Sequence, residues 1–66
     1  MRVTFNGKED EAADNTTLLD FITAKGIKAE GSAAACDGDV VPKKEWGSFK
    51  LKEGMSIDVF NLVAGG

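Results

Sequence analysis

The stretch AAACDGDVVP, residues 33–42, decides the fold. Its run of small apolar residues is typical of an interior strand that a helix covers closely. Asp37-Gly38 is a tight-turn signal, because both residues tolerate positive φ, and Val40-Val41 continues as the returning strand. Pro42 ends that strand, because it has no N–H to donate to a ladder. The stretch therefore predicts a strand, a turn and a second strand.

A second hairpin is predicted at the N-terminus. Residues 3–5 alternate apolar and polar side chains as a half-buried strand does, and Asn6-Gly7 is the strongest short hairpin signal. Residues 8–13 then return as a highly charged strand. Such charge suits a sheet edge that must resist pairing with another chain.

The segment between the hairpins predicts a helix over residues 17–25. Thr17 is the expected N-cap, and Gly26 suits the position after the helix, where left-handed geometry is needed. Three apolar side chains at i, i+3 and i+4 share one helix face: Leu18, Phe21 and Ile22.

The rest of the chain completes an α+β pattern. Residues 43–46 predict one turn of 3₁₀-helix, and residues 55–63 predict the final strand. We expect Trp46 and Phe49 to pack in a satellite core. The order of elements predicts one main helix packed on one face of a mixed sheet, in a single domain spanning residues 1–66.

Composition excludes several classes of function. The 66 residues hold 8 Lys and Arg against 11 Asp and Glu, for a net charge of −3. Without clustered cations we expect no nucleic-acid partner. One cysteine and no histidine leave no disulfide and no metal site, and a cysteine-poor domain suits the reducing cytoplasm. No signal peptide or apolar span of about 20 residues is visible, so we expect no membrane partner.

Few side chains of this sequence could take part in a reaction. No histidine can activate a Ser or Cys, and no glycine-rich loop cradles a phosphate, so we expect no enzyme and no bound cofactor. Cys36 is the one nucleophile to consider. It lies in an apolar run, where burial raises the thiol pKa, which favours a structural role over redox or sulfur-relay chemistry.

The C-terminus is the unusual feature, because the final strand runs directly into Ala64-Gly65-Gly66. Glycines lack a Cβ and can thread a narrow channel. Three extended residues reach about 10 Å. We therefore expect residues 64–66 to form a flexible tail that carries the Gly66 carboxylate into a buried site of another protein.

The final strand also suggests where a partner docks. Successive side chains point to opposite faces of a sheet, so Ile57 and Val59 should face the helix. Phe60 and Leu62 then lie on the other face, next to the tail. An exposed apolar pair there is a candidate docking patch for an activating enzyme.

Taken together, these motifs resemble the ThiS-type sulfur carriers of thiamin thiazole biosynthesis, which belong to the ubiquitin-like β-grasp superfamily. The resemblance covers nearly the whole chain: FNG at 5–7, TLLDF at 17–21, DGDVVPK at 37–43 with Trp46, and VAGG at 63–66. Two positions depart from the family pattern. Asp37 stands where Asn is common, and Met55 stands where an Asp usually follows the glycine.

The resemblance implies a protein co-substrate. A ThiF-like adenylating enzyme would use ATP to convert the Gly66 carboxylate into an acyl-adenylate. Sulfur from a donor such as a cysteine desulfurase would displace AMP and leave a nucleophilic thiocarboxylate. A ThiG-like thiazole synthase would receive that sulfur.

Two alternatives remain open at the level of sequence. Carriers for molybdopterin, cysteine or homocysteine synthesis share the fold and the tail chemistry. A ubiquitin-like modifier would instead join Gly66 to a lysine through an isopeptide bond.

Overall fold

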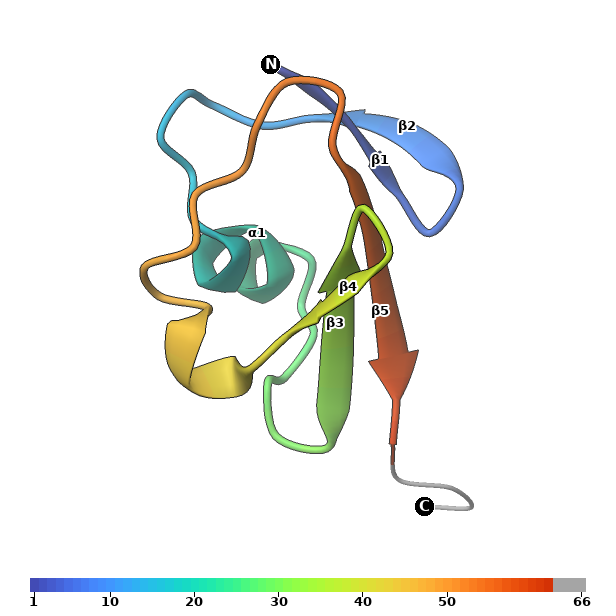
Figure 1. The fold of residues 1–66 in the computed structure, drawn as a ribbon, viewed down its shortest axis with the longest axis vertical. Helices are drawn as coiled ribbons and strands as arrows, with labels where there is room; N and C mark the ends of the chain where they lie inside the picture. The colour runs from blue at the N-terminus through green and yellow to red at the C-terminus, as the bar shows by residue number, and fades with distance from the viewer. Residues whose placement is uncertain (63–66) are drawn as a thin grey trace.

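The computed structural model describes residues 1–62 and is shown in Figure 1. Its elements follow the predicted order, with ends that shift by one or a few residues. They are β1 (Arg2–Phe5), β2 (Lys8–Glu11), α1 (Leu18–Ala24), β3 (Ser32–Cys36), β4 (Asp39–Val41), the 3₁₀-helix η1 (Lys43–Glu45) and β5 (Ser56–Asn61). No helix among these residues is long and apolar enough to cross a membrane.

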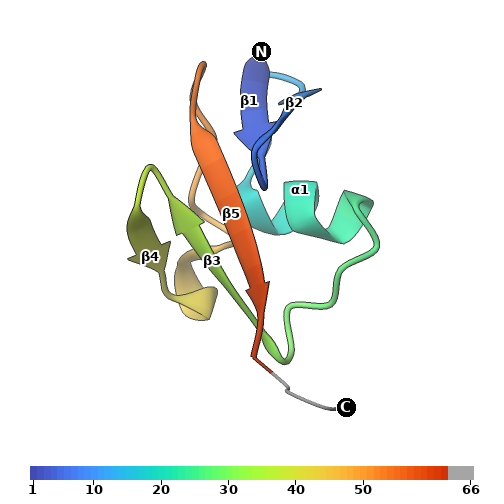
Figure 2. The same cartoon turned by 90° about the vertical axis from the view of Figure 1, so that its right-hand side faces the viewer.

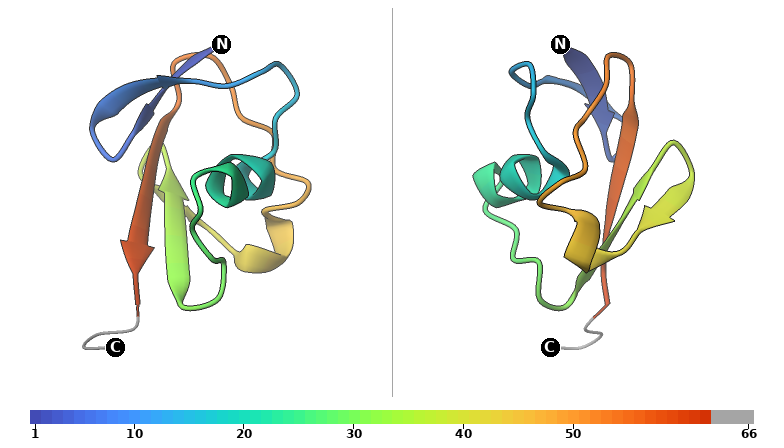
Figure 3. Two further views of the ribbon diagram at one scale, coloured as in Figure 1. Left: turned by 180° about the vertical axis from the view of Figure 1, so that it is seen from behind. Right: turned by 60° about the vertical axis from the view of Figure 1, so that its left-hand side comes forward.

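The strands form one mixed sheet in the order β2-β1-β5-β3-β4. The central strand β5 runs parallel to β1 and antiparallel to β3 (Figure 2). The charged strand β2 lies at one edge and the small-residue strand β3 lies inside, as the sequence predicts. Helix α1 covers one face of this sheet (Figure 3).

Both predicted tight turns are confirmed, and each has two residues with positive φ. Asn6 and Gly7 have φ of 48° and 85°, and Asp37 and Gly38 have φ of 51° and 87°. Two central residues with positive φ match the right-handed twist of the flanking strands. The N-terminal turn therefore joins β1 to β2, and the second turn joins β3 to β4.

The same two turns hold the central strand through their side chains. Asn6 Oδ1 accepts a hydrogen bond from the Val59 backbone N–H at 2.8 Å. Asp37 Oδ1 accepts one from the Ser56 backbone N–H at 2.9 Å. Each turn therefore holds β5 through one backbone N–H, at Val59 and at Ser56.

The predicted signals also fix the ends of α1. Thr17 Oγ1 accepts a hydrogen bond from the Asp20 backbone N–H at 3.1 Å, which confirms Thr17 as the N-cap. Gly26 has a φ of 79°, which confirms the left-handed residue after the helix. The three predicted core residues of the helix are buried.

Lys25 joins the end of α1 to the N-terminal hairpin. Its ammonium group pairs with the Asp10 carboxylate of β2. It also lies 5.4 Å from the ring centroid of Phe5 and 5.1 Å from that of Phe21. The hydrogen bond from Lys25 lowers the pKa of Asp10.

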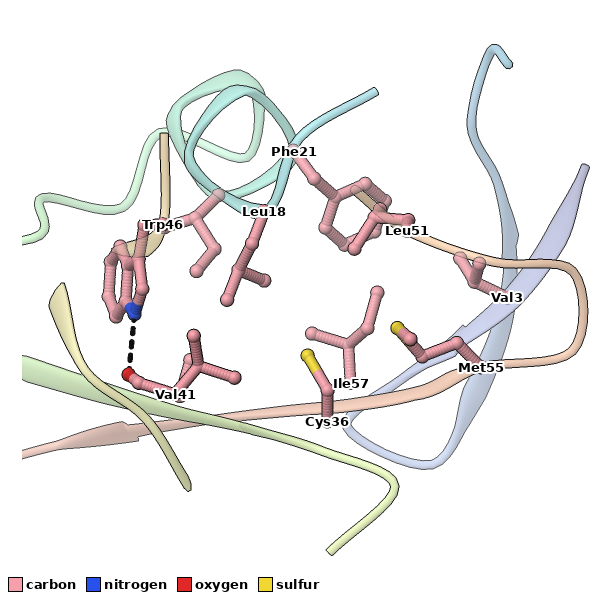
Figure 4. Close-up of a cluster of buried hydrophobic side chains, with 11 residues drawn as sticks. Val3, Leu18, Phe21, Cys36, Val41, Trp46, Leu51, Met55 and Ile57 are labelled. Carbon is pink, nitrogen blue, oxygen red and sulfur yellow. Dashed lines mark hydrogen bonds between the residues drawn. The ribbon is translucent and has the colours of Figure 1, made fainter. Parts of the chain in front are cut away.

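The prediction of a satellite core was wrong for Trp46. This side chain is 1% exposed and belongs to the main core, and Phe49 packs against that core. The Trp46 indole N–H donates to the Val41 carbonyl at 2.8 Å (Figure 4). Trp46 joins the main core because of contacts between segments that are distant in sequence. The first N–H groups of α1, on Leu18 and Leu19, donate to the carbonyls of Phe49 and Trp46. These bonds hold the 3₁₀ segment against the start of the helix.

Candidate functional site

The candidate site begins where β5 ends. The Leu62 N–H donates to the Gly31 carbonyl at 2.7 Å, so chain pairing continues to the last described residue. The predicted reactive group on Gly66 and the tail residues Gly65 and Ala64 lie outside residues 1–62. What the structure provides is the surface next to the point from which these residues continue.

The predicted alternation along β5 is confirmed. Ile57 is fully buried, and Val59 is partly buried and packs against the core. Phe60 is 53% exposed and Leu62 is 63% exposed. Because these two residues are large and apolar, their exposure at the end of β5 points to a contact surface.

Val40 extends this surface, and the sequence reasoning missed it. In the sheet register, Phe60 lies opposite Ala33, and Val40 lies opposite Ala35. The two alanines are two residues apart on β3, so all four side chains share one face. Val40 is 70% exposed. We call Val40, Phe60 and Leu62 the outer patch.

Hairpin geometry could have identified Val40. The two-residue turn pairs Cys36 with Asp39, which fixes the alternation along β4. Val41 is buried in the core, so its neighbour Val40 must point away from it. A double valine alone does not reveal which member faces solvent.

An acidic residue accompanies the outer patch. Asp58 lies opposite Ala35 and alternates with Phe60, so it projects from the same face. The ion pairs among residues 1–62 are Arg2–Glu9 and Lys25–Asp10, so Asp58 belongs to neither. The surface therefore suits a partner that places a cation beside an apolar contact.

Cys36 is buried on the other side of the sheet, within the core (Figure 4). Burial raises the pKa of its thiol to about 11, and the negative charges of Asp37 and Asp58 add to this shift. The thiol is therefore protonated at neutral pH, whereas nucleophilic chemistry requires the thiolate. This environment supports the structural interpretation of Cys36.

The Cys36 environment predicts a specific pH dependence of stability. The unfolded thiol ionises near its ordinary pKa of 9.0, whereas the folded thiol keeps its proton up to about 11. Alkali therefore favours the unfolded state, and wild type should lose on the order of 1–3 kcal/mol relative to Cys36→Ala across this range. Urea unfolding of both proteins at matched pH measures the difference. Identical pH profiles would contradict the assignment.

The arrangement of the helix and the strands identifies the fold class of the protein. One helix on a mixed sheet of order β2-β1-β5-β3-β4 is the β-grasp fold of the ubiquitin-like proteins. Two solved structures from Geobacter metallireducens share it. The crystal structure of the thiamine biosynthesis protein (ThiS) matches with a TM-score of 0.86 at 22% identity, over the whole of both chains. A solution structure of a thiamine biosynthesis protein matches with a TM-score of 0.80 at 20% identity, over all of this chain and 88% of that one.

Sequence comparison narrows this class to a family. The ThiS family model matches residues 3–66, and the chain belongs to the ThiS family. A curated relative, the sulfur carrier protein ThiS of Escherichia coli (strain K12), is 26% identical over 66 residues and is covered completely, as is this chain.

Proposed function

We propose that this chain carries sulfur for thiamin thiazole synthesis as a thiocarboxylate on its C-terminal Gly66. The observation that carries the proposal is the family match, which runs through the terminal glycines to residue 66. The full-length relative named as a sulfur carrier supports it. The exposed apolar surface beside the end of β5 adds a place for an enzyme that acts on this terminus.

The chemistry requires activation by a partner. A free carboxylate is a poor electrophile, because its charge repels nucleophiles and oxide is a poor leaving group. A ThiF-like enzyme transfers AMP from ATP to the Gly66 carboxylate and releases pyrophosphate. A persulfide donor, charged by a cysteine desulfurase, attacks this acyl-adenylate. AMP leaves, and reduction of the resulting acyl disulfide by a thiol frees the thiocarboxylate.

The chain acts in this scheme as a co-substrate. Its single thiol is buried and protonated, and the sequence has no histidine to serve as a general base near neutral pH. A ThiG-like thiazole synthase accepts the sulfur and returns the carboxylate. We place this cycle in the cytoplasm, where reducing conditions preserve the thiocarboxylate.

Intact mass spectrometry tests the proposed chemistry. The full chain is incubated with a ThiF-like enzyme, ATP and a sulfide source. We expect a mass gain that matches one oxygen exchanged for sulfur, located on Gly66 by fragmentation. Omission of ATP is the control. A chain that instead forms covalent adducts with lysines of other proteins would be a modifier, and the proposal would be wrong.

We further propose that the outer patch docks the adenylating enzyme. Phe60→Ala removes an exposed aromatic ring near the end of β5, so the KM of the enzyme for the carrier should rise about tenfold or more. The melting temperature should change little, because Phe60 is already 53% exposed. Steady-state AMP transfer and thermal unfolding measure the two effects.

A matched variant separates docking from a general loss of apolar surface. Leu19 is 38% exposed and lies on α1 rather than on β5. Leu19→Ala should leave the KM unchanged. Equal effects of the two variants on KM, or unfolding of Phe60→Ala, would refute docking at the outer patch.

A further inference from the structure

The turn between β1 and β2 contains the most reactive asparagine of the chain, Asn6. The backbone nitrogen of the residue after an asparagine can attack the side-chain amide carbon, and glycine obstructs this attack least because it has no Cβ. Asn6 and Gly7 are both exposed, and a Cβ placed on Gly7 would meet nothing within 4 Å. The other two asparagines of the sequence precede a threonine and a leucine, whose side chains hinder the attack.

This attack leads to deamidation without any enzyme or cofactor. The Gly7 nitrogen forms a bond to Asn6 Cγ, the bond from Cγ to Nδ2 breaks, and the proton of the Gly7 N–H leaves with the amide nitrogen as ammonia. Water then opens the five-membered succinimide ring at one of its two carbonyls. One product has aspartate at position 6. The other has isoaspartate there, so its main chain runs through the former side chain.

The folded turn holds the two reacting atoms apart. Asn6 has a φ of 48°, which places it in the left-handed region, where ψ is about +30 to +60°. Ring closure in an L residue requires a strongly negative ψ instead, because Cβ and the next nitrogen must lie on the same side of the Cα–C bond. Two hydrogen bonds to β5 oppose this rotation. The Asn6 N–H donates to the Ile57 carbonyl at 2.8 Å, and Asn6 Oδ1 accepts from the Val59 N–H at 2.8 Å.

We propose that Asn6 is a deamidation site that the folded turn blocks and that local opening of the β1–β2 hairpin exposes. The hairpin forms one edge of the sheet, and such units open at a lower free energy than the whole domain. Lys25 resists this opening from outside the turn. Its ammonium pairs with Asp10 of β2 and lies 5.4 Å from the ring centroid of Phe5 in β1. Opening of the hairpin is thereby converted, slowly and irreversibly, into a change of covalent structure.

The two products should differ in stability. Asp37 has the equivalent place in the second turn, with a φ of 51°, and its Oδ1 accepts a hydrogen bond from the Ser56 N–H at 2.9 Å. Aspartate at position 6 can therefore keep the bond to Val59. Isoaspartate adds a methylene to the main chain within a two-residue turn, which disturbs the register of the β1–β2 pairing. The isoaspartate form should therefore melt at a lower temperature than the unmodified chain.

Peptide mapping by mass spectrometry tests the proposal on the full chain. Wild type, Lys25→Met and Lys28→Met are incubated at neutral pH, both folded and in guanidinium chloride. The measured quantity is the rate at which each asparagine exchanges its amide NH2 for OH. In denaturant, Asn6 should react faster than Asn15 and Asn61. In the folded wild type, the Asn6 rate should fall by about tenfold or more, because only the open hairpin reacts.

The two lysine variants test whether the hairpin controls the reaction. Lys25→Met removes the ion pair with Asp10, so the folded chain should deamidate several times faster at Asn6. Lys28→Met is the matched control, because it removes an exposed lysine that follows the helix and lies outside this ion pair. Its rate should equal that of wild type. Asn6→Asp supplies one product directly, and its melting temperature should stay near that of wild type.

Four results would overturn the proposal. Equal Asn6 rates in the folded and denatured chains would show that the turn does not block the reaction. A folded rate that global unfolding fully explains would exclude local opening of the hairpin. Equal rates in the two lysine variants would exclude Lys25 as the restraint. An isoaspartate form that melts with wild type would refute the difference between the products. None of these measurements involves Gly66 or an activating enzyme, so they are independent of the proposed function.

Discussion

The structure depends on how the backbone of β5 is held at the centre of the sheet. Strand β1 pairs with Ser56 and Ile57 of this strand, and β3 pairs with its residues 57–61. The turn residues Asn6 and Asp37 then partner the Val59 and Ser56 N–H groups. Each such hydrogen bond contributes only about 0.5–1.5 kcal/mol to stability. These contacts fix the register of β5, and register decides which side chains face the core.

The two faces of β5 therefore have different roles, one in the core and the other on the surface. Ile57 is fully buried under α1, whereas Phe60 and Leu62 remain exposed on the other face. A 66-residue domain has little core to spare, so large exposed side chains are a liability unless a partner covers them. The chemistry proposed for Gly66 requires no catalytic groups in the core. The buried, protonated thiol of Cys36 fits this arrangement.

Local signals in the sequence predicted the parts of the fold that local physics determines. Asn6-Gly7 and Asp37-Gly38 require positive φ, and Thr17 with Gly26 brackets α1, so these features followed from single residues. The role of Trp46 did not follow, because its position depends on hydrogen bonds between the start of α1 and a segment nearly thirty residues later.

The candidate site, like the fold, could be predicted from the sequence only in part. The exposure of Phe60 and Leu62 followed from alternation along one strand. The contribution of Val40 required the pairing of β4 with β3, and the contact of Leu62 with Gly31 required the loop after α1 to lie against β5. Relations of this kind join elements that are distant in sequence, so periodicity in a single segment cannot reveal them.

Removal of Gly66 alone tests the central claim most directly. A chain that ends at Gly65 keeps every described contact of β5, so it should melt at the same temperature as the full chain. In a reconstituted system with the activating enzyme, a sulfur donor and thiazole synthase, it should deliver no sulfur to the thiazole. Undiminished sulfur delivery by this folded, shortened chain would contradict the account.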